Sequence, residues 1–376
     1  MKKLFLCSVC LWILDSSVKF VISFRVLFLC WIGELSLRHQ KMASAVPSTS
    51  AAAGPAGDPA KYAVGERECL INQCEVCTYT SRSFYRLHDA QEALFRFFYS
   101  NGVLPCHYNC PTCGAVLKWN SSHTFRCQQK NKRNKRKCKT HISAFTSSFF
   151  FYMHLTPQQI VELVWLYIAR SPPRCAFLQQ DTGLSTRTLT NWFSFMREVF
   201  IAWAVNNSQD LEGEGVVVEI DEAKIGKRKY NRGWYLEGQW VFGGIERGTK
   251  NFFLIAVEDR TADTLLSIIR EKIRPGTTIF SDCWRSYDRL GEENYTHLTV
   301  NHSINFVDPN TGAHTQNIEW TWVEVRKNVP RFGRKKPHYE GYLSECLFKM
   351  RFPNYTQRFH QFWKGAAELY PGLPHA

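Results

Sequence analysis

Three acidic residues stand at positions whose neighbours are largely apolar. Asp221 closes the stretch GVVVEID, Asp282 closes TTIFSD, and Glu319 lies in HTQNIEWTW. Carboxylates that converge beside an apolar sheet repel one another and are costly to keep ionised unless cations neutralise them. Hard oxygen ligands suit Mg²⁺ or Mn²⁺, and two such ions ~3.5–4 Å apart can drive an in-line phosphoryl transfer. The sequence therefore predicts a metal site for phosphoryl transfer formed by Asp221, Asp282 and Glu319.

The order of the predicted elements indicates how these three acids could lie close together in the fold. From residue 215, the hydrophobic pattern predicts three strands, a helix, a strand, a short helix, a strand and a closing helix. That order is typical of a ribonuclease H-like α/β fold, in which acids at the ends of neighbouring strands and on a helix across them converge. The first strand is expected to end at Asp221 and the fourth at Asp282. The alternative is that strands simply end in acids, and it leaves three ordinary candidates: Glu219, Glu222 and Asp259.

A cysteine pattern upstream predicts a second kind of metal site. In CPTCG, two residues separate Cys110 from Cys113, and the glycine that follows them suits a tight turn. With Cys127 and Cys138 they offer four thiolates to one tetrahedral Zn²⁺, which would stabilise a segment too short to fold by burial alone. The sequence thus predicts a zinc ribbon; the alternative is a set of reduced structural cysteines without metal.

Other cysteines have less regular spacing. They could form a second site, although the irregularity argues against it, with ligands drawn from Cys69, Cys74, Cys77, Cys106, His88 and His107. A disulfide framework is disfavoured if the protein is intracellular.

The charge predicts a polyanionic partner. Lys and Arg outnumber Asp and Glu by 47 to 33, which gives a net charge of +14, while aromatic residues make up 14% and indicate a folded protein. The basic residues cluster in QQKNKRNKRKCK and RFGRKKPH; solvated loops or localisation signals are the alternatives. A flexible run of like charges has no fixed geometry for base edges, so we expect phosphate contacts from Lys130, Lys132, Arg133, Lys135, Arg136 and Lys137.

A helical region is predicted between the cysteines and the strands. LTPQQIVELVWLYIARSP has apolar residues at three- and four-residue steps, with Thr156 as N-cap candidate and Pro157 in the first turn. CAFLQQDTGLSTRTLTNWFSFMREVF then predicts a short helix, a turn at Gly183 and a helix capped by Ser185 or Thr186. This is helix-turn-helix spacing, although plain packing is the alternative. In the first case the major groove would be read by Thr186, Arg187, Thr190 and Asn191.

The first 60 residues are expected to be a disordered or spurious extension. Residues 1–41 begin like a signal peptide, but Asp15, Lys19 and Arg25 interrupt the apolar run, so no membrane span is predicted. We expect translation from Met42, and peptides from residues 3–41 in the native protein would contradict that expectation. The predicted organisation is extension 1–60, zinc-ribbon region 61–150, helix-turn-helix-like region 151–212 and catalytic domain 213–370.

Several motifs together resemble one family. EIDEAKIGKR, SDCWRSYDRL, VNHSINFVDPNTGAHTQNIEWTW and YLSECLFKMRF, with CPTCG upstream, are similar to those of Merlin-type DDE transposases and related bacterial insertion-sequence transposases. The likeness covers roughly residues 85–370. It implies that Asp221, Asp282 and Glu319 bind Mg²⁺ or Mn²⁺, and that His302 contacts the scissile phosphate or holds the closing helix. Arg326 stands where relatives commonly carry Lys, and it keeps the charge but not the geometry of a DNA contact.

The predicted function is cut-and-paste DNA transposition. The resemblance implies a nuclear homo-oligomer that binds the terminal repeats of an element in double-stranded DNA, cuts there and joins the ends to target DNA. One alternative is a host-adopted, transposase-derived DNA-binding protein without transposition activity. Another is a ribonuclease H-type nuclease or resolvase without strand transfer.

Overall fold

The structure is a computed structural model of the 376-residue chain. It describes residues 77–120, 122–130, 137–151, 154–170, 175–208, 210–211, 215–226, 238–249, 251–301, 304, 306–309, 312–330 and 334–372. Some predictions lie outside the described residues and stay predictions. They concern the extension 1–60, and the side chains of Cys69, Cys74, Lys132, Arg133, Lys135, Arg136 and His302.

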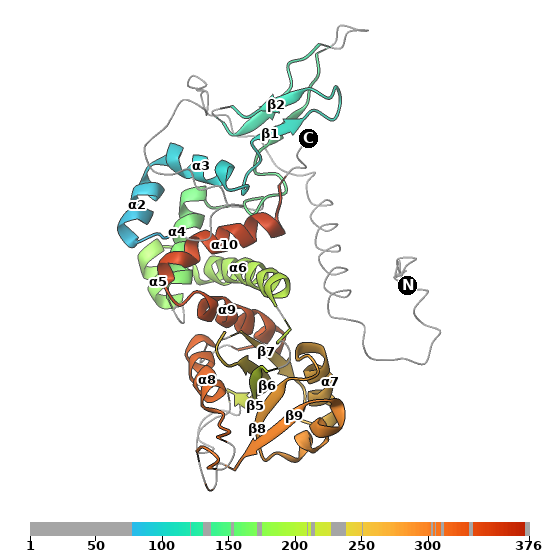
Figure 1. Ribbon diagram of the computed structural model, residues 1–376. Coiled ribbons are helices and arrows are strands. Elements are labelled where there is room, and N and C mark those ends of the chain that lie inside the picture. The colour runs from blue at the N-terminus through green and yellow to red at the C-terminus, as the bar shows by residue number, and fades with distance from the viewer. Residues whose placement is uncertain are drawn as a thin grey trace, which may run out of the picture. The chain divides into compact units, whose positions relative to one another are not determined.

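A mixed sheet forms the centre of the catalytic region. In the described residues it contains β5 (Val217–Ile225), β6 (Gln239–Glu246), β7 (Phe252–Val257), β8 (Thr278–Asp282) and β9 (Thr296–Val300). The strand order is β7-β6-β5-β8-β9, with β5, β6 and β7 antiparallel and both β8 and β9 parallel to β5 (Figure 1). This is the strand order of a ribonuclease H-like sheet, so the predicted α/β fold class of this region is confirmed.

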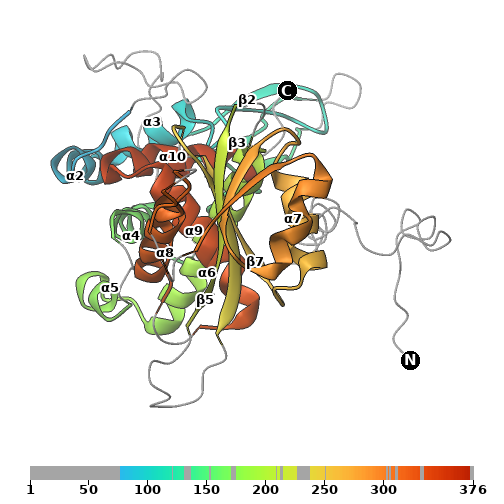
Figure 2. The ribbon, with the colours of Figure 1, turned by 60° about the horizontal axis from the view of Figure 1, so that its bottom comes forward.

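Helices cover both faces of the sheet. α7 (Ala262–Lys272) lies on one side, and α8 (Gln316–Asn328) and α9 (Tyr339–Arg351) lie on the other (Figure 2). Each face is apolar because side chains alternate along β5. The α7 face contains Val218 and Ile220 of β5 with Leu265, Leu266 and Ile269; the α8 face contains Ala223 and Ile225 of β5 with Ile318, Trp322 and Val325. Thr261 caps α7, as the sequence predicted.

One predicted detail of these elements is wrong. β5 does not end at Asp221 but continues to Ile225, because it keeps pairing with β6 through Ile225 and Gln239. The short helix predicted after Asp282 is present as the 3-10 helix η4 (Arg285–Glu293). β8 does end at Asp282.

A helical region precedes the sheet in the chain. It contains α2 (Ser81–Asp89), α3 (Gln91–Ser100), α4 (Pro157–Ala169), α5 (Cys175–Thr182) and α6 (Thr186–Asn207). Thr156 caps α4 in a reciprocal capping box with Gln159, and Ser185 caps α6. Gly183 separates α5 from α6 with a φ of 68°, a left-handed conformation that glycine adopts readily. The predicted caps and turn are thereby confirmed.

The last helix of the chain completes the core of this helical region. α10 (Tyr355–Leu369) buries Phe359, Phe362 and Trp363 among side chains of α2, α3, α4 and α6. The rings of Phe84 and Trp165 stack with centroids 4.5 Å apart, and Phe359 packs edge-on against both. Residues that are far apart in the sequence therefore share one hydrophobic core.

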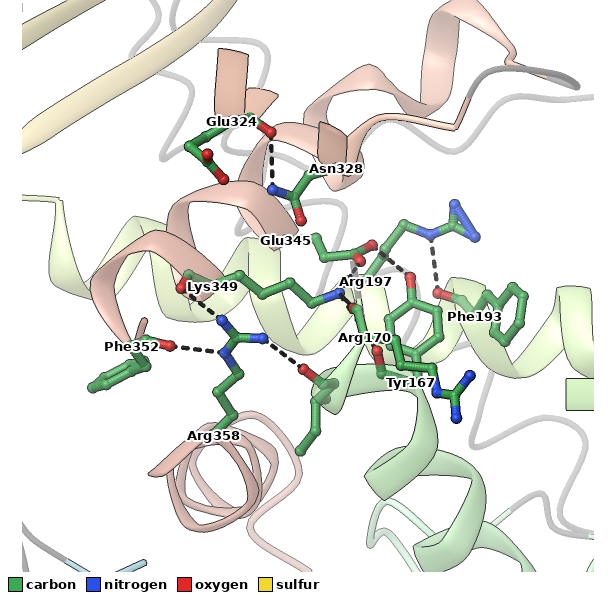
Figure 3. A network of polar contacts seen from close by, with 11 residues as sticks. Tyr167, Arg170, Phe193, Arg197, Glu324, Asn328, Glu345, Lys349, Phe352 and Arg358 are labelled. Carbon is green, nitrogen blue, oxygen red and sulfur yellow. Dashed lines mark hydrogen bonds and ion pairs between the residues drawn. The ribbon is translucent and has the colours of Figure 1, made fainter. Parts of the chain in front are cut away.

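A buried polar network joins α4 to α9 and α10 (Figure 3). Glu345 accepts hydrogen bonds from the Tyr167 hydroxyl at 2.5 Å and from Lys349 Nζ at 2.7 Å. Lys349 also donates to the Arg170 carbonyl, and Arg358 donates to the Ile168 carbonyl. These two cations thus bind carbonyls at the C-terminal end of α4, where the helix dipole favours positive charge.

Two small hairpins carry the cysteine pattern. β1 (His107–Asn109) pairs with β2 (Val116–Lys118), and β3 (Thr124–Arg126) pairs with β4 (His141–Ser143). His123, between the hairpins, stacks on Phe95 of α3 with ring centroids 3.7 Å apart, and its Nδ1 lies 3.1 Å from the Tyr99 hydroxyl. Burial lowers the pKa of His123 to about 4, so the ring is neutral at pH 7.

In the described part of the chain, no helix is both long and apolar enough to span a membrane.

Candidate functional site

Asp221 of β5 and Asp282 of β8 point to the same face of the sheet. The parallel pairing of β5 with β8 runs from Val217 opposite Thr278 to Glu219 opposite Phe280. Each acid lies two residues beyond the last of these pairs, so the alternation of side chains points both acids to the same face. The two carboxylates therefore emerge together where the neighbouring strands stop pairing.

Asp221 and Asp282 are half-buried, whereas Glu319 is exposed, and Asp221 has two hydrogen-bond donors. Its Oδ2 accepts a hydrogen bond from Trp322 Nε1 at 2.9 Å, and its Oδ1 accepts one from the Glu222 amide at 2.8 Å. Burial raises the pKa of Asp221 to about 6; the two hydrogen bonds lower it, and the charges of Asp282 and Glu319 raise it further. The charges of all three acids therefore act on the Asp221 carboxyl.

Glu319 reaches this environment from the first turn of α8. Trp322, three residues on, is 3% exposed and packs on the sheet, whereas Trp320 is 57% exposed. The close approach of α8 depends on Gly243, which pairs with Asp221 across β5 and β6. A Cβ at Gly243 would lie 2.9 Å from Cη2 of Trp322, so a side chain there would push the helix away from the sheet.

The structure distinguishes the acids that the sequence left as alternatives. Asp259 accepts bonds from Thr261 and Thr264 and so belongs to the start of α7. Glu219 is fully buried and bound to Arg247 and α8. Glu222 bonds the Tyr287 hydroxyl. Burial raises the pKa of Glu222 to about 7; the Tyr287 bond lowers it, and the charges of Asp221 and Asp282 raise it. Glu222 is therefore coupled by charge to Asp221 and Asp282, although the alternation of side chains along β5 directs it to the opposite face of the sheet, where it meets Tyr287.

The cluster of Asp221, Asp282 and Glu319 is suited to hold divalent cations. Its ligands would be hard carboxylate oxygens. Burial makes the ionised form of Asp221 costly and so raises its pKa, and a bound cation would offset that cost. Among the described residues, only the four cysteines bring three or more ligand atoms within 4.8 Å of one another. The acids are therefore spaced more widely than the ligands of a single enclosed ion.

The four predicted zinc ligands do come together. The Sγ atoms of Cys110, Cys113, Cys127 and Cys138 all lie within 4.8 Å of one another, with contacts of 3.4 Å between Cys110 and Cys138 and 3.5 Å between Cys113 and Cys127. Zn–S bonds near ~2.3 Å in a tetrahedron require Sγ atoms about 3.8 Å apart. Gly114 makes the predicted turn with a φ of 70°. The geometry of these thiols thus fits one tetrahedral metal ion.

The predicted DNA-contacting side chains that are described are all exposed. Lys130 and Lys137 form an isolated bridge at the base of the basic loop. Arg187 and Asn191 lie in the first two turns of α6, and Arg326 lies two turns after Glu319 on α8. Exposure leaves these side chains accessible to a ligand.

Comparisons with known proteins agree with the transposase resemblance. Residues 210–351 match the family model of the ISXO2-like transposase domain. An uncharacterised transposase-like protein of Haemophilus influenzae is 34% identical over 103 residues, which are 27% of this chain and 80% of that protein.

Two solved structures are similar at a low level. The HTLV-2 integrase catalytic core in complex with magnesium has a TM-score of 0.20 and 11% identity, over 38% of this chain and 86% of that chain. The mariner Mos1 paired end complex with Mg has a TM-score of 0.15 and 11% identity, over 58% and 77%. TM-scores this low do not establish a shared fold. The fold class is therefore assigned from the strand order of the sheet.

A ribonuclease H-like sheet with clustered carboxylates on β5, β8 and α8 is the kind of site that suits phosphoryl transfer. The family match identifies the group to which this site belongs. The chain is a member of the family of proteins with an ISXO2-like transposase domain.

Proposed function

We propose that the protein is a DDE-type DNA transposase that cuts at the terminal repeats of its element and joins the freed ends to target DNA. The proposal is supported chiefly by Asp221 and Asp282 on neighbouring parallel strands, with the charge of Glu319 on α8 acting on Asp221, within a transposase-family domain. Bound Mg²⁺ or Mn²⁺ would supply activation of the attacking hydroxyl and stabilisation of the leaving oxygen. The resemblance of the motifs around His302 supports the proposal that the protein is a Merlin-type member of this group.

The side chains of the site have separate tasks in this proposal. Asp221 and Asp282 hold cations at the divergence of β5 and β8, and Glu319 closes the site from α8. Trp322 fixes one oxygen of Asp221 and keeps α8 on the sheet. His302 contacts the scissile phosphate or holds α8 in place, and Arg326 contacts the DNA backbone.

DNA binding is assigned to the regions before the sheet. We propose that the four clustered cysteines hold one Zn²⁺ and that the basic loop between Cys127 and Cys138 binds phosphates. The exposed start of α6 carries Arg187 and Asn191 and, as the second helix of a helix-turn-helix, would enter the major groove. The protein acts in the nucleus as a homo-oligomer, since joining an element requires both of its ends.

The test is strand cleavage by the purified protein. Double-stranded DNA carrying the sequences that flank the coding region is incubated with Mg²⁺, beside the variants Asp282→Asn and Glu319→Gln. The parent should release strands with free 3′-hydroxyls at the repeat ends, while both variants bind the DNA without cutting it. Specific binding by the parent without any cleavage in Mg²⁺ or Mn²⁺ would instead support the host-adopted DNA-binding protein.

A further inference from the structure

The start of α8 is held by an acid from β5. Glu219 is fully buried, and its Oε2 accepts hydrogen bonds from the backbone amides of Asn317 at 2.8 Å and Ile318 at 3.1 Å. Amides in the first turn of a helix have no acceptor within the helix, and a carboxylate there also complements the helix dipole. Glu219 therefore caps α8 from a neighbouring element, whereas the side chain of Thr315 makes no capping bond.

Arg247 completes the arrangement from the turn between β6 and β7. Its Nε donates to Glu219 Oε1 at 2.6 Å, and its Nη2 donates to the His314 carbonyl at 2.7 Å, just before α8. Asn317 Nδ2 is the second donor to Oε1, at 2.7 Å. The guanidinium also lies 4.5 Å from the centroid of the Phe280 ring on β8. Arg247 thus connects both acid-bearing strands to the segment that leads into α8.

Glu219 has no oxygen left for a metal ion. A carboxylate offers about four lone-pair sites, and four donors occupy them: Arg247 Nε, Asn317 Nδ2 and the two helix amides. Glu219 therefore acts through its neighbours rather than by touching the ion or the DNA.

β5 holds α8 at two points on the same strand face. Glu219 binds the helix at Asn317 and Ile318, and Asp221, two residues along, binds it at Trp322. Glu319 lies between these two attachments. We propose that Glu219 and Arg247 are a positioning pair that sets the distance of the Glu319 carboxylate from Asp221 and Asp282. This inference rests on the proposed function, because it assigns Glu319 to the same metal site.

The test compares Glu219→Gln with a destabilised control. Glu219→Gln keeps the side-chain length but turns one acceptor into a donor that faces donors, so the first turn of α8 loses part of its cap. Ile269→Ala removes buried packing of α7 on the opposite face of the sheet and leaves α8 untouched. Three quantities are measured for both variants, for Glu319→Gln and for the parent: Mn²⁺ affinity without DNA, by calorimetry; amide hydrogen exchange at Asn317 and Ile318; and cleavage rate against Mn²⁺ concentration.

Glu219→Gln should bind Mn²⁺ about 10- to 100-fold more weakly, as removal of a residue that orients a ligand usually does. Its two α8 amides should exchange faster, and high Mn²⁺ should restore cleavage, which it should not do for Glu319→Gln. Ile269→Ala should show none of these changes at a temperature where it is folded. If Glu219→Gln does not fold, Arg247→Lys is measured in its place. One ammonium cannot reproduce the two directed bonds of the guanidinium. We expect the same loss of Mn²⁺ affinity and faster amide exchange, both smaller than for Glu219→Gln.

Parent-like Mn²⁺ affinity in a folded Glu219→Gln or Arg247→Lys protein would overturn the positioning role. A parent protein that neither binds Mn²⁺ nor cleaves DNA would overturn the proposed function itself. The two failures are therefore distinguishable in the same experiment.

Discussion

Replacing Asp221 by Asn should stabilise the protein in the absence of divalent cations. The pKa of Asp221 is raised from 3.8 to about 6, chiefly by burial and also by the charges of Asp282 and Glu319. A folded-state pKa above the unfolded value means that the folded protein binds the proton more tightly, so stability is lost as pH rises from about 4 to about 6. Ionisation of this single carboxyl therefore costs the folded state about 3 kcal/mol at neutral pH, at 1.36 kcal/mol per pH unit.

Asn removes the charge but not the whole interaction. It retains one of the two acceptors that Asp221 offers to Trp322 and to the Glu222 amide. Loss of the other hydrogen bond costs about 1 kcal/mol, so the net gain at pH 8 should be about 1–2 kcal/mol. Below pH 4 both side chains are neutral, and the variant should be slightly less stable than the parent.

Chemical denaturation of both proteins at pH 4 and pH 8, in buffer without added Mg²⁺ or Mn²⁺, measures this reversal. Adding Mn²⁺ at pH 8 should then stabilise the parent by mass action and leave the variant nearly unchanged. A variant that is less stable than the parent at pH 8 without metal would refute the reasoning, because the buried charge would then not be a liability.

Other changes test separate parts of the molecule. Trp322→Ala should lower the free energy of unfolding by about 3–5 kcal/mol, whereas the exposed Trp320→Ala should change it by less than about 0.5 kcal/mol; equal losses would contradict the packing of α8. Cys113→Ser should lose one zinc equivalent in elemental analysis and bind DNA more weakly, and unchanged zinc content would remove the ribbon site. Replacing the Lys and Arg of residues 130–137 by Gln should flatten the salt dependence of DNA binding by up to ~0.9 for each phosphate that the protein no longer neutralises, with sequence preference kept. Because the pKa of His123 is about 4 in the fold, its packing on α3 should weaken as pH falls from 6.5 to 4; a His123→Phe variant, which cannot titrate, should keep its hydrogen-exchange protection in α3 over that range.

Local pattern was enough to predict the sheet and the acids on it. The hydrophobic runs around Asp221 and Asp282 predicted β5 and β8, and caps such as Thr261 predicted where helices begin. The end of β5 was wrong because its last residues remain apolar and paired with β6, so Asp221 lies within the strand and not at its end.

Long-range partners could not be predicted in the same way. Glu219 was only an ordinary alternative in the sequence, since its partners Arg247 and Asn317 are 28 and 98 residues away. Likewise, nothing local to Tyr355–Leu369 indicates that α10 fills a core together with α2, α3, α4 and α6. Glu222 was likewise only an ordinary alternative in the sequence, because its link to Asp221 and Asp282 is electrostatic and does not follow from a spacing motif.

The position of helix α9 limits how the protein can be cut into separately folding fragments and how its gene can recombine. Its Tyr342, Leu343 and Cys346 belong to the core beneath the sheet, while Phe348 belongs to the core of the helical region, and Lys349 binds the end of α4. A fragment that stops before α9 would leave both cores open at once. We therefore expect that neither the helical region nor the region of the sheet folds when it is expressed alone. Neither region should be exchangeable for the corresponding region of a relative. Recombination within such genes should give a folded protein only where the α4 and α9 sequences come from the same parent gene.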